Sequence, residues 1–330
     1  MDNKKKSFED LMRETFGAAM QEEVSSSDKN GDERFPLCDN IDTAIIMHRD
    51  VHFKGNFTAM IDYYQRGGKG AQPAFTVERL RQLQALEAAA EQDLIEILLA
   101  PSDLEKMHEA LEAYQKLRSV YEQKEQQPSP HLKLLANLIL TEEEEAHKEV
   151  QAVVNEGRVI VPRLLQLIQS PEFHDPLWPG YGLAPELAAK CLGHIGDSDA
   201  IVNLFEAIED YDFFGEDTVF RAFKHIGEPA KQFLLGILEK TPPTRDSERA
   251  ARALIYFSPD EEVAKCCLNL LQMDAILNMS TLATYLVLNC AGLQSEEDRL
   301  AFLTMAQHNK INDQLQRDIK SVASEFTSRE

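Results

Sequence analysis

The stretch PELAAKCLGHIGDSDAIVNLFEAIED, which spans residues 185–210, decides the fold of this chain. Its first half places apolar side chains at i, i+3, i+4 and i+7, on one face of a helix: Ala188, Cys191, Leu192 and Ile195. Its second half repeats that spacing with Ile201, Leu204, Phe205 and Ile208. Between the two halves, Gly196 suits the left-handed residue that ends a helix, because glycine has no Cβ to clash. The stretch therefore predicts two helices joined by a tight turn.

The same pattern returns each time the sequence is shifted by 31 residues. The shift aligns Leu192 with Phe223, Leu254 and Tyr285. The same shift aligns Ile195 with Ile226, Phe257 and Leu288. It also aligns Gly196 with Gly227, Ser258 and Asn289. A fixed period of this size predicts a solenoid, because each unit is too small to bury its own apolar face and neighbouring units complete the core. We therefore expect an all-α fold, with an α-solenoid of helical pairs from about Pro185 to Gln307.

The repeat resembles the HEAT-like repeats of bacterial proteins, a class also found in phycobilisome lyases. The residues that carry the resemblance are Ala188-Ala189, Leu192-Gly193, Ile195-Gly196-Asp197, Ala200 and Leu204. It covers about residues 141–307, and the later units replace the Gly-Asp pair with Gly-Glu, Ser-Pro and Asn-Cys. The resemblance implies a scaffold and no particular reaction, although it leaves a lyase-like activity open.

The charge of the chain bears on its partners. The 330 residues carry a formal net charge of −22, and residues 141–330 contribute −15 of it, with 17 basic and 32 acidic residues. A surface this negative repels phosphate backbones, which argues against nucleic-acid binding. It favours a protein or peptide partner of basic character.

The cysteines and the N-terminus bear on compartment and cofactors. Four of the five cysteines fall at or beside predicted core positions, where cysteine behaves as a small apolar residue. Because no CxxC pair or zinc spacing occurs, we expect reduced thiols, no cofactor and a cytoplasmic location. Lys4-Lys5-Lys6 is not followed by the apolar segment of a secretory signal, and no stretch is long enough for a membrane span. Type III secretion has no defined motif, so a secreted bacterial effector stays open.

Composition divides the chain into three parts. Residues 1–34 are polar and predict a disordered tail. Residues 35–127 predict a helical N-terminal domain, in which residues 76–126 form a long αα-hairpin. The spacing of its second helix assigns five residues to the seam of the hairpin, namely Leu104, Met107, Leu111, Tyr114 and Tyr121. The run Gln126-Gln127-Pro128-Ser129-Pro130 breaks the helix, and residues 131–330 follow as the solenoid.

Three motifs of the N-terminal domain suggest chemistry that their surroundings do not support. His48-Arg49-Asp50-Val51 is similar to the catalytic loop of protein kinases, but no glycine-rich nucleotide loop, strand lysine or DFG accompanies it. Gly67-Gly68-Lys69-Gly70 lacks the spacing of a phosphate-binding loop and predicts a flexible turn. His48 and His52 stand at i, i+4, but a third metal ligand is not evident, so we expect a structural pair and no metal site.

Two aromatic and acidic segments form the predicted binding site. An insertion at residues 170–182 carries the only tryptophan, and a second loop covers residues 210–217. Both follow second helices of the repeat, so both should emerge from one edge of the stack, where insertions often bind partners. The alternative is that Trp178 and Phe213 fold back to seal the helix ends. The predicted binding residues are Phe173, His174, Asp175, Trp178, Tyr181, Tyr211, Asp212, Phe213, Phe214, Glu216 and Asp217.

Two classes of function remain open at this point. The favoured hypothesis is a non-enzymatic scaffold or adaptor that binds a protein or peptide, with no catalytic residues and an undetermined oligomeric state. The alternative is an enzyme or metalloprotein on the same scaffold. Its motif signals are weak, because His108-Glu109 is the only His-Glu dipeptide and lies outside the repeats. His194 and His225 occupy equivalent positions in adjacent units, and their spacing predicts solvent-exposed side chains.

Overall fold

A computed structural model describes residues 40–122, 130–143, 145–210, 215–307 and 311–327 of the chain. In these residues every regular element is a helix, from α3 to α20 with short 3-10 turns between them, so the predicted all-α fold is confirmed. None of the helices in the described ranges is long and apolar enough to span a bilayer. The predicted tail at residues 1–34 lies outside the described residues.

The chain forms two compact units, and the boundary differs from the predicted one. The N-terminal unit extends to Glu149 and also includes Glu172–Ala184, while the C-terminal unit comprises Val150–Pro171 and the chain from Pro185 onward. The division at residues 127–131 stays a prediction. Because the insertion after Pro171 packs within the N-terminal unit, the chain leaves the C-terminal unit there and returns to it at Pro185.

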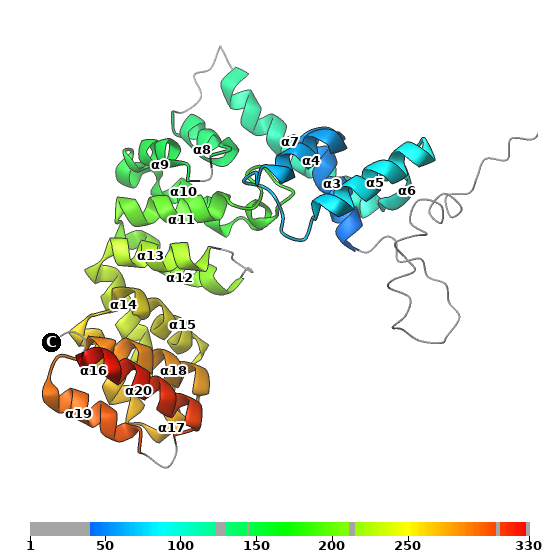
Figure 1. Cartoon of the computed structure of the whole chain (residues 1–330). Coiled ribbons are helices and arrows are strands. Elements are labelled where there is room, and N and C mark those ends of the chain that lie inside the picture. The colour runs from blue at the N-terminus through cyan, green and yellow to red at the C-terminus, as the bar shows by residue number, and fades with distance from the viewer. Residues whose placement is uncertain (1–39, 123–129, 144, 211–214, 308–310, 328–330) are drawn as a thin grey trace, which may run out of the picture. The chain divides into compact units, whose positions relative to one another are not determined.

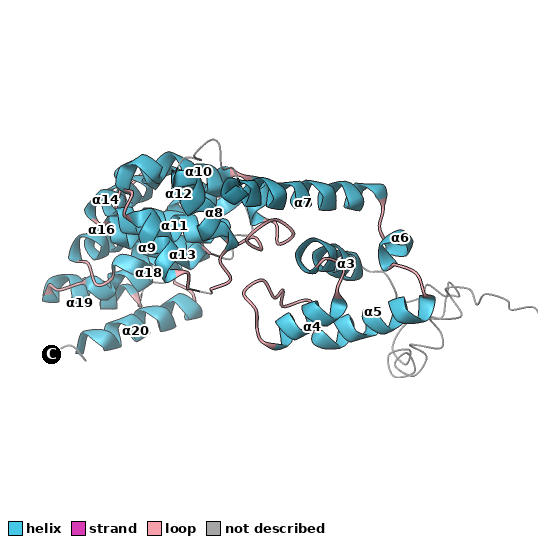
Figure 2. Cartoon of the chain, turned by 90° about the horizontal axis from the view of Figure 1, so that it is seen from above, coloured by secondary structure: helices cyan, strands magenta, loops and turns pink. Residues whose placement is uncertain are grey.

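In the N-terminal unit, one helix lies between the others. The helices are α3 Asn40–Phe53, α4 Phe57–Gln65, α5 Val77–Ala90, α6 Leu94–Leu98, α7 Pro101–Glu122 and α8 Pro130–Leu140. Figure 2 shows α3 between α7 on one side and α4 with α5 on the other. Side-chain caps fix several helix starts: Asn56 accepts from the Ala59 amide at 3.0 Å and Thr76 from the Arg79 amide at 3.2 Å.

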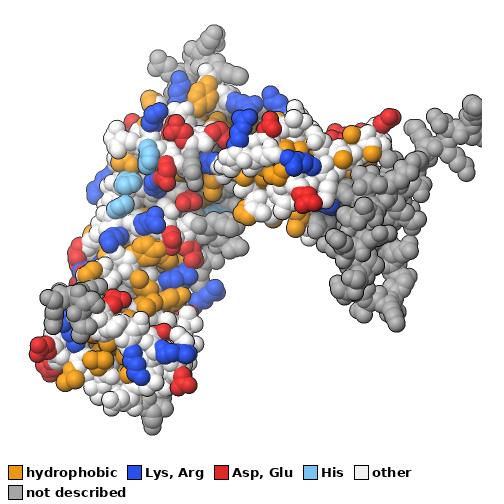
Figure 3. Space-filling view, viewed as in Figure 1, with side chains coloured by type: hydrophobic (Ala, Val, Ile, Leu, Met, Phe, Trp, Pro, Cys, Tyr) orange, Lys and Arg blue, Asp and Glu red, His pale blue; other side chains and the backbone are white. Residues whose placement is uncertain are grey.

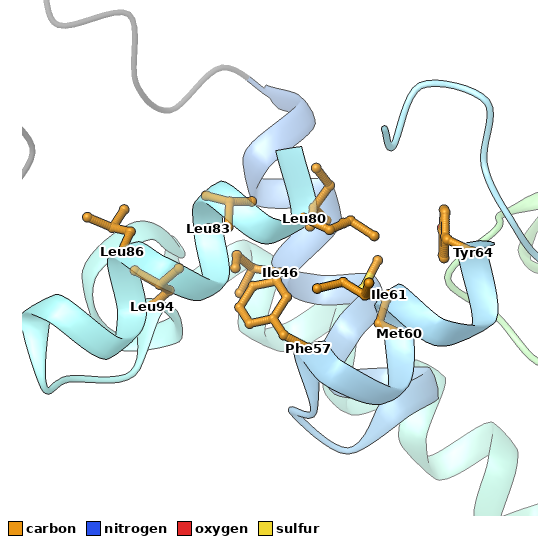
Figure 4. Close-up of a cluster of buried hydrophobic side chains, with 10 residues drawn as sticks. Ile46, Phe57, Met60, Ile61, Tyr64, Leu80, Leu83, Leu86 and Leu94 are labelled. Carbon is orange, nitrogen blue, oxygen red and sulfur yellow. The ribbon is translucent and has the colours of Figure 1, made fainter. Parts of the chain in front are cut away.

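The apolar faces of α5 and α7, the helices of the predicted hairpin, enter two different clusters. The first cluster joins α3, α4, α5 and α6 (Figure 4) and contains Ile45, Ile46, Phe57, Met60, Ile61, Tyr64, Leu80, Leu83, Leu86 and Leu94. The second joins α3, α7 and the insertion, through Met47, Val51, Met107, Ala110 and Leu177. Leu104 and Leu111, which the spacing assigned to the hairpin seam, are 43% and 36% exposed. The two helices are present, but α7 packs through a face rotated from the predicted one.

The C-terminal unit is a succession of helices that pack on their neighbours. After α9, His147–Val154, the helices are α10 Val161–Gln169, α11 Ala184–Ile195, α12 Ile201–Asp210, α13 Glu216–Ile226, α14 Glu228–Leu238, α15 Arg245–Leu254, α16 Glu261–Leu271, α17 Asp274–Leu277, α18 Ser280–Asn289, α19 Glu296–Met305 and α20 Asp313–Thr327. Figure 1 shows them following one another in chain order from α11 to α19. Helix α14 packs against α15, α16 against α18, and α18 against α20. This arrangement is compatible with the predicted α-solenoid.

The burial of the aligned residues agrees with the 31-residue period in three units and differs from it in the fourth, and the period itself stays a prediction. Leu192, Phe223 and Leu254 are all fully buried, as the alignment predicts. In the next unit Tyr285 is only half-buried, and Leu286 is the residue with no exposed surface. The short helix α17 between α16 and α18 lengthens this unit, which accounts for the shifted register. The neighbouring prediction for Leu288 is likewise wrong, because that side chain is 40% exposed.

Neighbouring units approach closely at one glycine. A Cβ added at Gly193 in α11 would lie 2.6 Å from Cα of Ala222 in α13. That distance is too short for any side chain, so the absence of a Cβ sets how closely the two helices pack. Gly236 in α14 is also helical, but a Cβ there would meet nothing within 4 Å.

Candidate functional site

The predicted binding residues are divided between the two units. Five of them lie in the insertion, within the N-terminal unit: Phe173, His174, Asp175, Trp178 and Tyr181. Glu216 and Asp217 begin α13 in the C-terminal unit. The remaining four lie outside the described residues: Tyr211, Asp212, Phe213 and Phe214. The joint surface stays a prediction, because its two described parts belong to different units.

The described insertion residues contribute to the packing of the N-terminal unit. Trp178 is half-buried and packs against the second apolar cluster, in which Leu177 is buried. The ring of Phe173 meets Trp178 edge to face, with centroids 5.9 Å apart. Asp175 accepts a hydrogen bond from the Leu177 amide at 2.8 Å, which stabilises the turn of the insertion. Tyr181 is 9% exposed. These contacts favour a structural role for this part of the predicted site.

The two carboxylates at the start of α13 also have partners within their own unit. Glu216 pairs with the guanidinium of Arg252 at 2.8 Å. Asp217 accepts a hydrogen bond from the hydroxyl of Tyr256. Each contact joins α13 to the segment 252–256, one repeat further along the chain. Neutralising these carboxylates should therefore alter packing as well as surface charge.

The densest group of titratable side chains in the N-terminal unit is a cluster of two histidines and four tyrosines, which the sequence did not predict as a unit. We call it the His–Tyr cluster, and its members are His48, His52, Tyr63, Tyr64, Tyr114 and Tyr181. The two imidazoles come from successive turns of α3, with ring centroids 4.3 Å apart. The tyrosines come from α4, α7 and the insertion, so the cluster joins segments that are distant in sequence.

Hydrogen bonds fix the tautomer of His52. Its Nε2 lies 3.0 Å from the carbonyl oxygen of Pro176, which can only accept, so Nε2 carries the proton. Its Nδ1 therefore accepts from the hydroxyl of Tyr114 at 2.8 Å. Burial lowers the pKa of His52 to about 4, against a smaller opposing effect of the Pro176 carbonyl. Both ring nitrogens are thus occupied and the ring is neutral near pH 7, which leaves no free base for proton transfer.

His48 is more deeply buried than His52. Burial, with a further contribution from neighbouring His52, lowers the pKa of His48 to about 2. Aromatic rings surround it, including Phe75 at 5.5 Å and Tyr64 at 6.1 Å between centroids. Its Nε2 atom has no hydrogen-bond partner among the described residues. A charged imidazole would lose its hydration here without gaining a counter-ion, so the site enforces the neutral form.

The glycine run beside the cluster is a packing surface for tyrosine rings. A Cβ at Gly70 would lie 2.2 Å from the ring of Tyr181, and one at Gly68 would lie 2.3 Å from the ring of Tyr63. Lys69 donates a hydrogen bond to the carbonyl of Thr141 at 2.9 Å. The predicted turn is present, and its glycines allow the close approach of two aromatic rings.

One carboxylate completes the cluster. Tyr63 and Tyr181 donate to the two oxygens of Glu142, each at 2.9 Å. Burial raises the pKa of both phenols, so both remain protonated donors at neutral pH. This exposed glutamate ties the segment after α8 to α4 and to the insertion.

The motif His48-Arg49-Asp50 has a structural explanation. Arg49 is 1% exposed, and its guanidinium pairs with Asp50 at 2.6 Å, Glu87 at 2.5 Å and Asp93 at 3.0 Å. It also lies 4.7 Å from the ring centroid of Phe57. The buried charge is thus balanced by three carboxylates that join α3 to α5 and the start of α6. Asp50 serves this network.

The remaining candidates for reactive or metal-binding groups offer little chemistry. Burial raises the pKa of Cys191 to about 12 and that of Cys266 to about 11, and it also raises those of Cys267 and Cys290. Such thiols stay protonated, whereas nucleophiles and metal ligands need the thiolate. Cys38 lies outside the described residues. Within the described ranges, no group of three or more His, Cys, Asp or Glu side chains could hold a metal ion.

The histidines of the repeat are exposed, as their spacing predicts. His194 and His225 stack with ring centroids 4.7 Å apart on the surface of adjacent units. The stacking places these two positions side by side on α11 and α13. Tyr256 stands at the next equivalent position and packs against Phe220, so this row offers two imidazoles and no further ligand of that kind.

An apolar groove runs along α19 in the C-terminal unit. It has a volume of about 640 Å³ and is lined by Gln272, Glu297, Leu300, Ala301, Thr304, Met305 and Gln307. Leu300, which lines the groove, is 66% exposed, and Leu303 of the same helix is 42% exposed. Figure 3 shows hydrophobic side chains at this end of the unit, with acidic side chains next to them. Helix α19 also buries Phe302 completely, so it presents apolar side chains both to the core and to solvent.

Sequence analysis did not identify this groove, although a signal was present. The run Leu300–Met305 is apolar except for Thr304, and a helix that is apolar all round should be covered on every side. In the described residues only the inner side of α19 is covered. An exposed apolar surface with a polar rim is the usual composition of a protein-binding site.

Comparison with known proteins gives no further guidance to the site: the chain matches no protein-family model, no curated protein and no solved structure.

Proposed function

We propose that this chain is a non-enzymatic scaffold of HEAT-like repeats that binds a protein or peptide partner through the groove along α19. The observation that carries the proposal is the exposure of Leu300, which lines that groove. Scattered apolar side chains on a surface are ordinary, but Leu300 lines the groove together with Ala301 and Met305, beside the carboxylate of Glu297.

The state of the titratable side chains supports binding over catalysis. His52 has both nitrogens engaged, Arg49 is neutralised within its own unit, and the described thiols have raised pKa values. Catalytic groups usually have pKa values near the working pH and a face open to substrate. The groups found here instead stabilise contacts between helices.

Matched variants of the full chain test the proposal. The double variant Leu300→Ser with Leu303→Ser removes the apolar face of α19. The control Val159→Ser with Val202→Ser removes two side chains of the same unit that are 63% and 50% exposed. Proteins captured by the tagged wild-type chain are quantified by mass spectrometry. We expect the control to retain the specifically captured protein and the α19 variant to lose it by at least about tenfold, as for hot-spot residues.

The result that would overturn the proposal is equal capture by all three chains. Loss of capture with Phe173→Ser, and not with the α19 variant, would instead assign binding to the insertion. Circular dichroism of each variant establishes that the fold is unchanged before capture is compared.

A further inference from the structure

We infer that the groove along α19 binds a basic amphipathic helix of a partner protein, an inference that rests on the proposed function and specifies its ligand. Three features of the groove carry it: an apolar floor along α19, an acidic end and the inward position of the basic side chain of α19.

The shape of the groove fits a helix. Its floor is formed by Leu300, Ala301 and Met305, which follow one another along α19, and Gln272 after α16 forms part of its wall. Helix α19 has ten residues, so it is about 15 Å long. A partner helix of about three turns matches that length and can place its i, i+3, i+4 and i+7 side chains in the groove.

The charge around the groove is acidic. Glu296, Glu297 and Asp298 form the first turn of α19, and Glu297 also lines the groove. Acidic residues at this position stabilise the helix itself through its dipole, but that effect requires no apolar face beside them. Together the carboxylates and the apolar floor match a partner that has one apolar face and one positive end.

The basic residue of α19 does not offset these charges at the groove. The Nε of Arg299 donates to the carbonyl of Leu293 at 2.9 Å. Its guanidinium lies over the ring of Phe326 in α20, 5.1 Å from the centroid. The side chain is therefore directed toward the core of the unit, and the outward face of α19 presents only acidic, apolar and neutral polar side chains.

A second copy of this chain fits the groove less well. In a symmetric dimer the same patch faces itself, so both copies would bring Glu296 and Glu297 into one interface. Like charges brought together at an interface oppose association. The net charge of −22 adds to that repulsion. A positively charged helix meets neither obstacle.

Three synthetic peptides of about 14 residues test the inference by fluorescence anisotropy with the full chain. The first has an apolar leucine and alanine face and a lysine face, the second replaces every lysine by glutamate, and the third scrambles the first so that its apolar residues share no face. We expect the first peptide to bind at least about tenfold more tightly than the other two. Only the first peptide has both an apolar face for the floor of the groove and positive charges for its carboxylates. The scrambled peptide controls for non-specific attraction to an acidic protein.

Variants localise the binding. Leu300→Ser with Leu303→Ser should weaken binding of the first peptide by at least about tenfold, whereas Val159→Ser with Val202→Ser should leave it unchanged. Glu296→Gln with Glu297→Gln should weaken it by about threefold or more and reduce its dependence on salt.

Several results would overturn the inference. Equal binding of the lysine and glutamate peptides would show that charge does not select the partner, and full binding to the α19 variant would place the ligand elsewhere. Sedimentation showing a dimer that Leu300→Ser dissociates would identify a second copy as the occupant. Tighter binding of a peptide of residues 4–19 than of the lysine peptide would identify this chain's own segment. If the peptides fail while protein capture is still lost in the α19 variant, the proposed function stands and only the helical basic partner is wrong.

Discussion

The His–Tyr cluster predicts that the N-terminal unit loses stability as the pH falls from 7 to 5. Burial lowers the pKa of His48 to about 2 and that of His52 to about 4, below the ordinary value of 6.5. Below pH 6.5, His48 and His52 therefore become protonated in the unfolded chain but stay neutral in the folded chain. The stability is fully present above that pH and is lost as the pH falls toward the folded pKa values.

The size of the effect follows from the two pKa values. Over this interval each histidine lowers the free energy of unfolding by about 2 kcal/mol, so the pair lowers it by about 4 kcal/mol. Carboxylates add a pH dependence of their own, which a variant can separate. In the double variant His48→Gln with His52→Gln, the decrease in the free energy of unfolding between pH 7 and pH 5 should be about 4 kcal/mol smaller than in the wild type. The part of the decrease that is due to the carboxylates should remain.

The assay is urea unfolding followed by tryptophan fluorescence. Trp178 is the only tryptophan of the chain and packs against the second apolar cluster, so its emission reports on the N-terminal unit. The control is His194→Gln with His225→Gln, two exposed histidines of the C-terminal unit, which should unfold as the wild type does at both pH values. If the cluster variant and the wild type show the same decrement, the burial of these imidazoles does not set the pH dependence.

Three other variants test the packing. Gly193→Ala should lower the free energy of unfolding by about 1–3 kcal/mol, because its Cβ meets Ala222 in α13, while Gly236→Ala should raise it by about 0.5–1 kcal/mol. Equal effects of the two variants in thermal unfolding would contradict the close approach of α11 and α13. Leu192→Ala should cost about 2–5 kcal/mol by loss of buried contacts and cavity formation, and His194→Ala under about 1 kcal/mol; the reverse order in urea would show that the facing of α11 is wrong. Trp178→Ala should lower stability by about 1–3 kcal/mol, since the side chain packs on the N-terminal unit; an unchanged melting temperature by circular dichroism would return the insertion to the role of free surface.

The sequence predicted the elements that depend on local pattern. Leu192, Phe223 and Leu254 are buried where the 31-residue period places them, because each occupies the same face of the first helix of its unit. The prediction that Tyr285 is buried failed, because α17 adds a helical turn to this unit. The periodicity of the flanking helices does not indicate that extra turn. It failed again in α7, where Leu104 faces solvent. Spacing identifies a helix, whereas the face that packs depends on the partner, here α3.

The candidate sites depended on contacts between distant residues. Tyr181 packs on Gly70 and donates to Glu142, and sequence spacing gives no sign of either contact. From the sequence, the insertion was therefore predicted to be an exposed aromatic loop. In the structure, the ring of Tyr181 packs against Gly70, in the space that a Cβ would occupy. The groove along α19 was not predicted, because an apolar helix is expected to be buried and not exposed. Only the arrangement of the stack shows that Leu300 has no neighbour covering it among the described residues.

The most direct measurement of the central claim is amide hydrogen exchange of the full chain with and without the partner protein that it captures. If the groove along α19 is the binding surface, amides in residues 297–307 exchange more slowly in the complex, and those in residues 172–184 are unchanged. Protection confined to residues 172–184, with none in α19, would contradict the account.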